Sequence, residues 1–243
     1  MLESILLSTL RISTFDGSKP LTNASGFLFE REDRLFLVTS QHVMYDEPTK
    51  HFPDRLEIEL HTDPANVAKT SGFSIPLYRE RKSAWRQGKD SAGEIDVAAI
   101  EIDRSALPAD ATYHCFTPAH LLDTHESVEI GTSILILGFP LGFHDALHRI
   151  PVARHAIISS SFGLRFQGEG YFLTDARTHR GSSGAPVVLR VEAPDDALGP
   201  LPWRLLGVHS SRVDVKTREA GEDEALGLNT AWYADILMTL TKD

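Results

Sequence analysis

The segment Thr174-Asp175-Ala176-Arg177-Thr178-His179-Arg180-Gly181-Ser182-Ser183-Gly184-Ala185-Pro186 is a polar turn with two glycines, and it leads directly into the apolar residues 187–189. A serine in such a turn can expose its hydroxyl while neighbouring backbone N–H groups point at the same spot. Short Gly-Ser strings of this kind are usually ordinary hairpin loops. Ser183 is therefore a candidate nucleophile only if other segments supply its partners.

A serine hydroxyl needs a base to take its proton and a third group to orient that base. The apolar segment 35–39 ends in a turn of small residues and delivers His42. The segment 94–102 begins a second apolar strand, in which Asp96 is the last polar residue before the apolar run. A histidine, an aspartate and a serine thus follow one another along the chain, each at the edge of an apolar strand.

These segments resemble the trypsin-like (chymotrypsin-fold) serine proteases, through VTSQH around His42, DVAAIEI from Asp96 and GSSGAP around Ser183. The strings at 138–142 and 207–211 extend the resemblance over nearly the whole chain. It implies that His42 acts as general base, that Asp96 orients it and that Ser183 attacks the substrate. It also implies that the backbone of the loop Gly181, Ser182 and Ser183 forms an oxyanion hole.

Two features distinguish the sequence from the digestive members of this family. Ser182 stands where zymogen-activated relatives have an aspartate, and the chain has no Ile-Val-Gly-Gly start, so we expect no activation by N-terminal trimming. The Thr-Asp-Ala lead-in at 174–176 and the string at 154–159 are more similar to bacterial members, including the high-temperature-requirement proteases.

The string Gly207-Val208-His209-Ser210-Ser211-Arg212 resembles that of glutamyl endopeptidases and exfoliative toxins. In those relatives a threonine, a histidine and sometimes a basic residue hold a substrate carboxylate, and Thr178, His209 and Arg212 fall on their positions. The resemblance implies a pocket formed by these three residues with Arg177, Ser210 and Ser211, and cleavage after Glu. A core histidine bonded to backbone is an equally good interpretation of His209.

Composition excludes several classes of function. The 243 residues carry a formal net charge of -10, which disfavours nucleic acid or an anionic membrane as the main partner. The single cysteine, Cys115, rules out an internal disulfide and indicates a reducing compartment, so we expect a cytoplasmic protein. The first residues lack a basic leader, and no apolar run reaches the roughly 18 residues of a membrane helix.

Alternating apolar residues between turn signals predict an all-β protein of two six-stranded antiparallel β-barrels with a short C-terminal helix. The resemblance implies that these barrels are chymotrypsin-like. We assign 1–115 to the N-terminal barrel, with His42 and Asp96. We assign 116–243 to the C-terminal barrel, with Ser183 and a helix over 231–240. The charged stretch 79–94 is expected to be a surface excursion.

The histidines and acidic residues show no ligand spacing, so we predict no metal and no cofactor. The expected partner is a protein or peptide substrate. Two alternatives stay open. One is a peptide-binding or scaffold module with a protease fold. The other is a latent protease whose loop 177–182 needs an activating partner protein.

Overall fold

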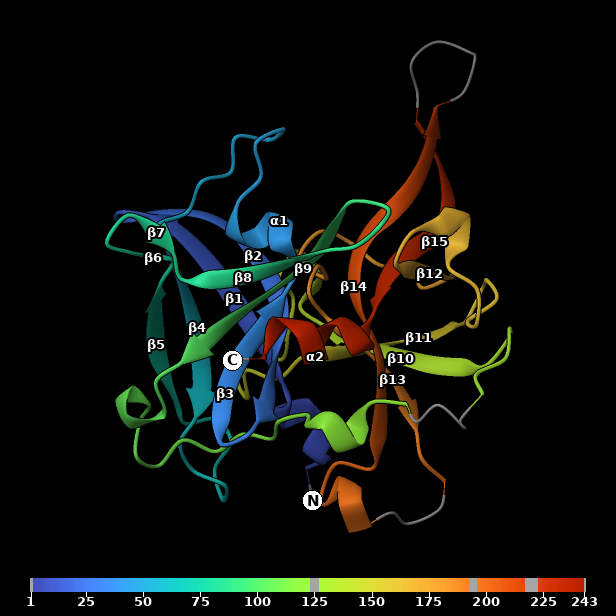
Figure 1. The fold of residues 1–243 in the computed structure, drawn as a ribbon. Helices are drawn as coiled ribbons and strands as arrows, with labels where there is room; N and C mark the ends of the chain where they lie inside the picture. The colour runs from blue at the N-terminus through green and yellow to red at the C-terminus, as the bar shows by residue number, and fades with distance from the viewer. Residues whose placement is uncertain (1, 123–126, 193–195, 217–222, 243) are drawn as a thin grey trace.

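Two antiparallel sheets, each curved into a barrel-like shape, lie side by side and make up most of the protein (Figure 1). The computed structural model describes residues 2–122, 127–192, 196–216 and 223–242. The first sheet comes from the N-terminal half of the chain and the second from the C-terminal half, in agreement with the all-β fold expected from the sequence.

The first sheet has the strand order β5-β4-β1-β2-β3-β9-β8. Its strands, with the small β6–β7 hairpin beside it, are β1 (Thr9–Asp16), β2 (Lys19–Arg31), β3 (Arg34–Thr39), β4 (Arg55–His61), β5 (Thr70–Pro76), β6 (Tyr78–Arg79), β7 (Lys82–Ser83), β8 (Trp85–Lys89) and β9 (Glu94–Ile102). A hairpin across Glu32 and Asp33 joins β2 to β3, and both turn residues have positive φ.

The second sheet has the order β11-β10-β13-β14-β15-β12. Its strands are β10 (Ser133–Gly138), β11 (Val152–Ile157), β12 (Tyr171–Thr174), β13 (Pro186–Arg190), β14 (Trp203–Lys216) and β15 (Asp223–Tyr233). Strand β13 begins at Pro186 and pairs with β14, so the turn that carries Ser183 enters the sheet beside the segment around Ser210.

The side-chain alternation of β3 explains why the two sheets pack together. Successive strand residues point to opposite faces. Leu35 and Leu37 fill the interior of the first barrel, whereas Phe36 and Val38 belong to a core that also contains Trp203 of β14. Both faces of β3 are therefore buried, which accounts for its nearly continuous apolar sequence.

The stretch 79–94 differs from the expected surface excursion because it contains β8, which pairs with β9 and makes this sheet seven-stranded. Its polar sequence gives no alternation because β8 is an edge strand held by backbone pairing. Gly88 is its one buried residue, and a Cβ at this position would lie 3.0 Å from Ile236 Cδ1.

Helices are short and lie outside the sheets. They are η1 (Ser4–Leu7), α1 (Gln41–Met44), η2 (Arg104–Ala106), η3 (Pro118–His120), η4 (Pro140–Gly142), η5 (Phe166–Gly168), η6 (Asp196–Leu198), η7 (Ala234–Ile236) and α2 (Leu237–Leu240). The first part of the helix predicted over 231–240 instead completes β15, while Leu237 and Leu240 of α2 join the core between the sheets (Figure 1). No helix in the described part of the chain has the length and apolarity to cross a membrane.

We predict that Phe27→Ala lowers the free energy of unfolding by about 3–5 kcal/mol, because it removes a fully buried ring from the core between the sheets. Phe27 also makes an edge-to-face contact with Phe116, with ring centroids 5.5 Å apart. Urea unfolding followed by tryptophan fluorescence measures the change. Phe143→Ala is the matched control, since Phe143 is 69% exposed and should change stability by about 0.5 kcal/mol or less.

Candidate active site

His42 and Asp96 meet at one end of the first barrel because of the β3–β9 register. Thr39, the last residue of β3, pairs with Ala98 of β9. The chain then turns into α1, which carries His42, while Asp96 lies two residues before Ala98. Asp96 Oδ2 lies 2.8 Å from His42 Nδ1, and its Oδ1 accepts a 2.9 Å hydrogen bond from the His42 backbone N–H.

This carboxylate fixes the protonation pattern of His42. Because Asp96 accepts at Nδ1, the neutral ring carries its proton there and leaves Nε2 as an acceptor. Burial disfavours the charged imidazole, but the hydrogen bond and the negative charge of Asp96 outweigh it and raise the pKa of His42. His42 is thus a base whose free nitrogen faces away from Asp96.

Ser210 of the second sheet makes a third contact to the same carboxylate. Its hydroxyl donates a short hydrogen bond to Asp96 Oδ2. Ser210 is buried, and its strand β14 also borders Ser183 through the neighbouring backbone. The aspartate therefore links the first sheet to the strand beside the candidate nucleophile.

Two glycines of the Ser183 loop are required by close backbone approaches. Gly184 has φ +84°, and a Cβ there would collide with Thr39 Oγ1 and the Ser25 carbonyl. Gly181 has φ +92°, and its Cβ would lie 2.5 Å from the Phe139 carbonyl oxygen. The glycine pattern in the sequence therefore reflects the packing of this loop against both sheets.

Ser25 ties the Ser183 loop to the first sheet, and the sequence analysis missed it. Its N–H donates to the Ser183 carbonyl at 2.9 Å, and its Oγ donates to the Gly181 carbonyl at 2.7 Å. The same Oγ accepts a 3.0 Å bond from the Phe139 N–H. Ser25 shares the face of β2 that carries Phe27, toward the second sheet, and this alternation is the only sequence signal for its role.

The orientation of the peptide between Arg180 and Gly181 matters for anion binding. Its carbonyl accepts a 2.5 Å hydrogen bond from the Leu141 N–H. Because the C=O and N–H of a trans peptide point in opposite directions, the Gly181 N–H points away from Leu141. The Ser182 N–H donates to the His179 carbonyl at 3.1 Å, so Gly181 and Ser183 are better placed than Ser182 to donate to an oxyanion.

Ser183 and His42 line one cavity of about 550 Å³, together with Gly181. The hydroxyl of Ser183 donates to the Ser210 carbonyl oxygen at 3.1 Å, and no hydrogen bond joins Ser183 to His42 among the described residues. The Ser183 hydroxyl is therefore bonded to β14 rather than to His42 within the described residues.

The residues of the expected carboxylate pocket are in different situations. The buried hydroxyl of Thr178 donates to Asn229 Oδ1 at 2.6 Å, and Asn229 in turn donates to the Ala176 carbonyl. Sequence reasoning did not identify Asn229. His209 is buried, and burial lowers its pKa to about 4, so its ring is neutral at pH 7. Within the described residues, its buried Nδ1 has no hydrogen-bond partner.

The other expected pocket residues lie at the surface. Arg177 is exposed beside Thr178. Ser211 is exposed and lies 3.2 Å, Oγ to Oγ1, from Thr230. Arg212 is exposed and pairs across strands with Asn229, which places it near Thr178.

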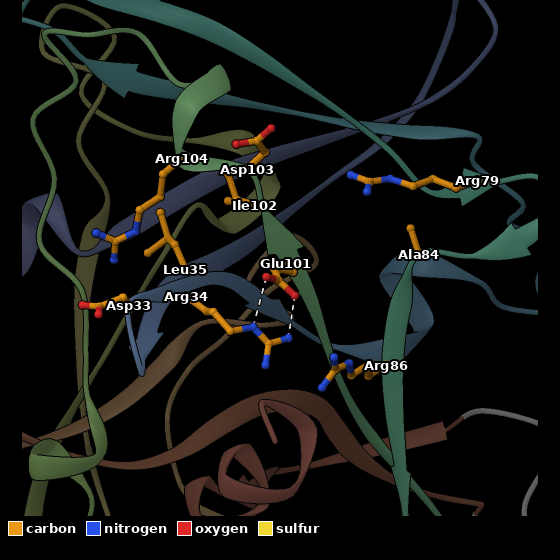
Figure 2. Close-up of a pocket in the computed structure, with 10 residues that line it drawn as sticks. All are labelled: Asp33, Arg34, Leu35, Arg79, Ala84, Arg86, Glu101, Ile102, Asp103 and Arg104. Carbon is orange, nitrogen blue, oxygen red and sulfur yellow. Dashed lines mark hydrogen bonds and ion pairs between the residues drawn. The ribbon is translucent and has the colours of Figure 1, made fainter. Parts of the chain in front are cut away.

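A cavity of about 500 Å³ at the opposite end of the first barrel combines arginines with acidic residues (Figure 2). Arg34, which begins β3, makes two hydrogen bonds to Glu101 of 3.0 and 2.6 Å. Arg104 of the same cavity pairs with Glu30. The cavity is a network of ion pairs, separated from His42 by the length of β3. Within the described residues, no group of His, Cys, Asp and Glu side chains could hold a metal ion.

Comparisons with known proteins agree with this architecture. A profile of the trypsin-like peptidase domain matches residues 24–192, more than half of the chain. Among solved structures, the serine endoprotease from Yersinia pestis is similar, with a TM-score of 0.55 and 16% identity. The match covers 96% of this chain and 61% of that one, and at this identity it concerns the fold alone. No curated protein matches the sequence.

We predict that Asp96→Asn lowers the pKa of His42 below its ordinary value of about 6.5, because burial then acts without the opposing carboxylate. In the wild type the pair stabilises the fold at low pH, and this contribution fades as pH rises through the raised pKa of His42. NMR titration of the imidazole protons, assigned with His42→Gln, measures the shift. The control Asp145→Asn removes the carboxylate that lies 2.8 Å from His148 Nδ1, and it should leave the pKa of His42 unchanged.

Proposed function

The chain belongs to the trypsin-like peptidase family, and from this premise we propose that it is a serine endopeptidase with Ser183 as nucleophile, His42 as base and Asp96 as the orienting acid. One observation carries the proposal. A single carboxylate holds the backbone and the ring of His42 and the hydroxyl of Ser210, at the edge of the cavity that contains Ser183. A neutral imidazole fixed in this tautomer is what activation of a serine requires.

Catalysis begins when the Ser183 hydroxyl turns from the Ser210 carbonyl to His42 Nε2. The oxygen attacks the substrate carbonyl while its proton passes to His42, and the Asp96 charge stabilises the resulting imidazolium. The N–H groups of Gly181 and Ser183 bind the developing oxyanion. His42 then gives its proton to the leaving amine, and a water molecule hydrolyses the acyl-enzyme by the reverse sequence.

We also propose that the enzyme cleaves after acidic residues, Glu above all. Arg212 brings a full positive charge to the mouth of the pocket, whereas His209 is neutral and offers one N–H. The hydroxyl of Thr178 is already committed to Asn229. Selectivity for a carboxylate over its amide isostere should therefore depend mainly on Arg212.

The substrate is a protein or peptide, and we place the enzyme inside a bacterial cell. The single cysteine supports a reducing compartment. Cys115 is half-buried. Its pKa is raised to about 12, mainly by burial and then by its hydrogen bond to Glu30, so its thiol is a poor nucleophile.

One observation favours a second candidate, a latent protease that needs a partner for activation. The Ser183 hydroxyl donates to the Ser210 carbonyl. A partner or substrate that turns this side chain toward His42 would then switch on catalysis. Labelling of Ser183 only after a partner is added would support this candidate.

We predict that a fluorophosphonate labels the wild-type protein at Ser183 and that Ser183→Ala abolishes both labelling and peptide hydrolysis. Only an activated serine hydroxyl forms the covalent adduct. Mass spectrometry of the labelled peptide identifies the site. Ser83→Ala, which changes an exposed serine of β7, is the matched control and should keep full labelling. Hydrolysis that survives in Ser183→Ala would contradict the assignment.

We predict that peptides with Glu before the cleaved bond have a kcat/KM about tenfold above that of the same peptides with Gln, and that Arg212→Met removes most of this difference. The ratio is measured by competition of the two peptides in one reaction. Arg154→Met on the edge strand β11 changes an exposed arginine away from the pocket and should keep the ratio. Equal cleavage of both peptides by the wild type would show that the pocket does not select acids.

A further inference from the structure

The cavity that contains Ser183 and His42 extends away from the expected Glu pocket. Its remaining walls come from the start of β2 and from the segment that follows α1. They consist of Lys19, Pro20, Leu21, Thr22, Asn23 and Ala24, then Val43, Asp46, Thr49, Lys50 and His51, with Arg180 beside Gly181. None of these residues belongs to β14 or β15, which carry Ser210, Arg212 and Asn229.

This position identifies the half of the substrate that the cavity receives. In the proposed mechanism His42 gives its proton to the leaving amine, so the segment after the cleaved bond lies beside His42. His42 borders the cavity, and Val43 and Asp46 continue the same wall. The residue before the cleaved bond lies on the other side of Ser183, toward Thr178 and Arg212. The cavity is therefore the site of the leaving segment.

Three cations line this cavity: Lys19, Lys50 and Arg180 are all exposed. In the described part of the chain, none of the three has an ion pair to a carboxylate, whereas Lys69 and Lys89 elsewhere are both paired. Asp46 is the one acidic residue among the described residues of the lining, and it accepts a short hydrogen bond from Thr49. Burial lowers the pKa of His51, which keeps that ring neutral near pH 7.

The cavity thus concentrates positive charge in a chain whose net charge is -10. Charge repulsion from the rest of the surface disfavours acidic peptides in general. Unpaired cations at one end of the active-site cleft reverse this locally, because a concave wall focuses the field on a bound segment. Apolar Pro20 and Leu21 of the same lining can contact the remaining side chains of that segment.

We propose that the leaving segment of the substrate is selected for acidic residues, and that Lys19, Lys50 and Arg180 determine this specificity. The inference rests on the proposed function, since it assigns the direction in which a substrate crosses Ser183 and His42. It adds a second acidic requirement on the far side of the cleaved bond. The preferred substrate class is an acidic segment that continues beyond the scissile bond.

The test compares peptides that are identical up to the cleaved bond and carry Asp, Asn or Lys at each of the first three positions after it. Cleavage at that one bond is followed by mass spectrometry. At low salt we expect kcat/KM to be about tenfold higher for the Asp peptide than for the Asn peptide, and lowest for the Lys peptide. The ratio of kcat/KM for the Asp peptide to that for the Asn peptide should fall at 0.5 M salt, because the Debye length is then only about 4–5 Å.

Charge reversal assigns the effect to these side chains. Lys19→Glu combined with Lys50→Glu should invert the order, so that the Lys peptide becomes the best of the three substrates. Comparing peptides as ratios cancels any general loss of active protein. Lys82→Glu in the β6–β7 hairpin is the matched control, and it should keep the wild-type ratio of Asp to Asn cleavage.

A binding measurement separates failure of this inference from failure of the proposed function. Fluorescent peptides with the sequence of each leaving segment are titrated into Ser183→Ala and followed by anisotropy, which needs no turnover. Tighter binding of the acidic peptide, lost in the Lys19→Glu and Lys50→Glu protein, supports the inference even if the wild type cleaves nothing. Equal binding and equal cleavage of the three peptides overturn it and leave the endopeptidase assignment intact.

Discussion

The arrangement of the whole site depends on the carboxylate of Asp96. It belongs to the first sheet, yet it accepts from Ser210 of the second sheet as well as from His42. These hydrogen bonds hold the carboxylate in one orientation. Asp96 thereby holds both His42 and the strand β14 that lies beside Ser183. The relative position of the two sheets is therefore part of the geometry of this site.

Much of this organisation could be predicted from the sequence, because it follows from short patterns. Alternation and turn residues located nearly all strands, and Val38 and Ala98 lie in runs apolar enough to mark β3 and β9 as buried. The stretch containing β8 was not recognised, since an edge strand with one buried glycine has no hydrophobic period. His42, Asp96 and Ser183 could be predicted because each lies next to a clearly apolar strand. Each also lies in a short sequence that resembles the family.

Residues that make contacts between the two sheets could not be predicted from sequence patterns. Ser25 lies in a strand without a recognisable motif. Its importance follows only from its hydrogen bonds to the Gly181 and Ser183 carbonyls. Asn229 is 51 residues from Thr178 in the chain, so its hydrogen bond to that hydroxyl depends on tertiary structure. The charge of the pocket was equally hidden, because the neutrality of His209 results from burial and not from its neighbours in the sequence.

The hydrogen bonds of Ser25 join two segments that are synthesised at different times. Residue 25 emerges early in synthesis and the loop that it supports emerges some 156 residues later. The carbonyls of Gly181 and Ser183 find their partner only after the first sheet has formed and the second has closed against it. A chain in which the two sheets are apart therefore lacks the hydrogen bonds that shape this loop. The shape of the loop that carries Ser183 is thus a property of the completed fold.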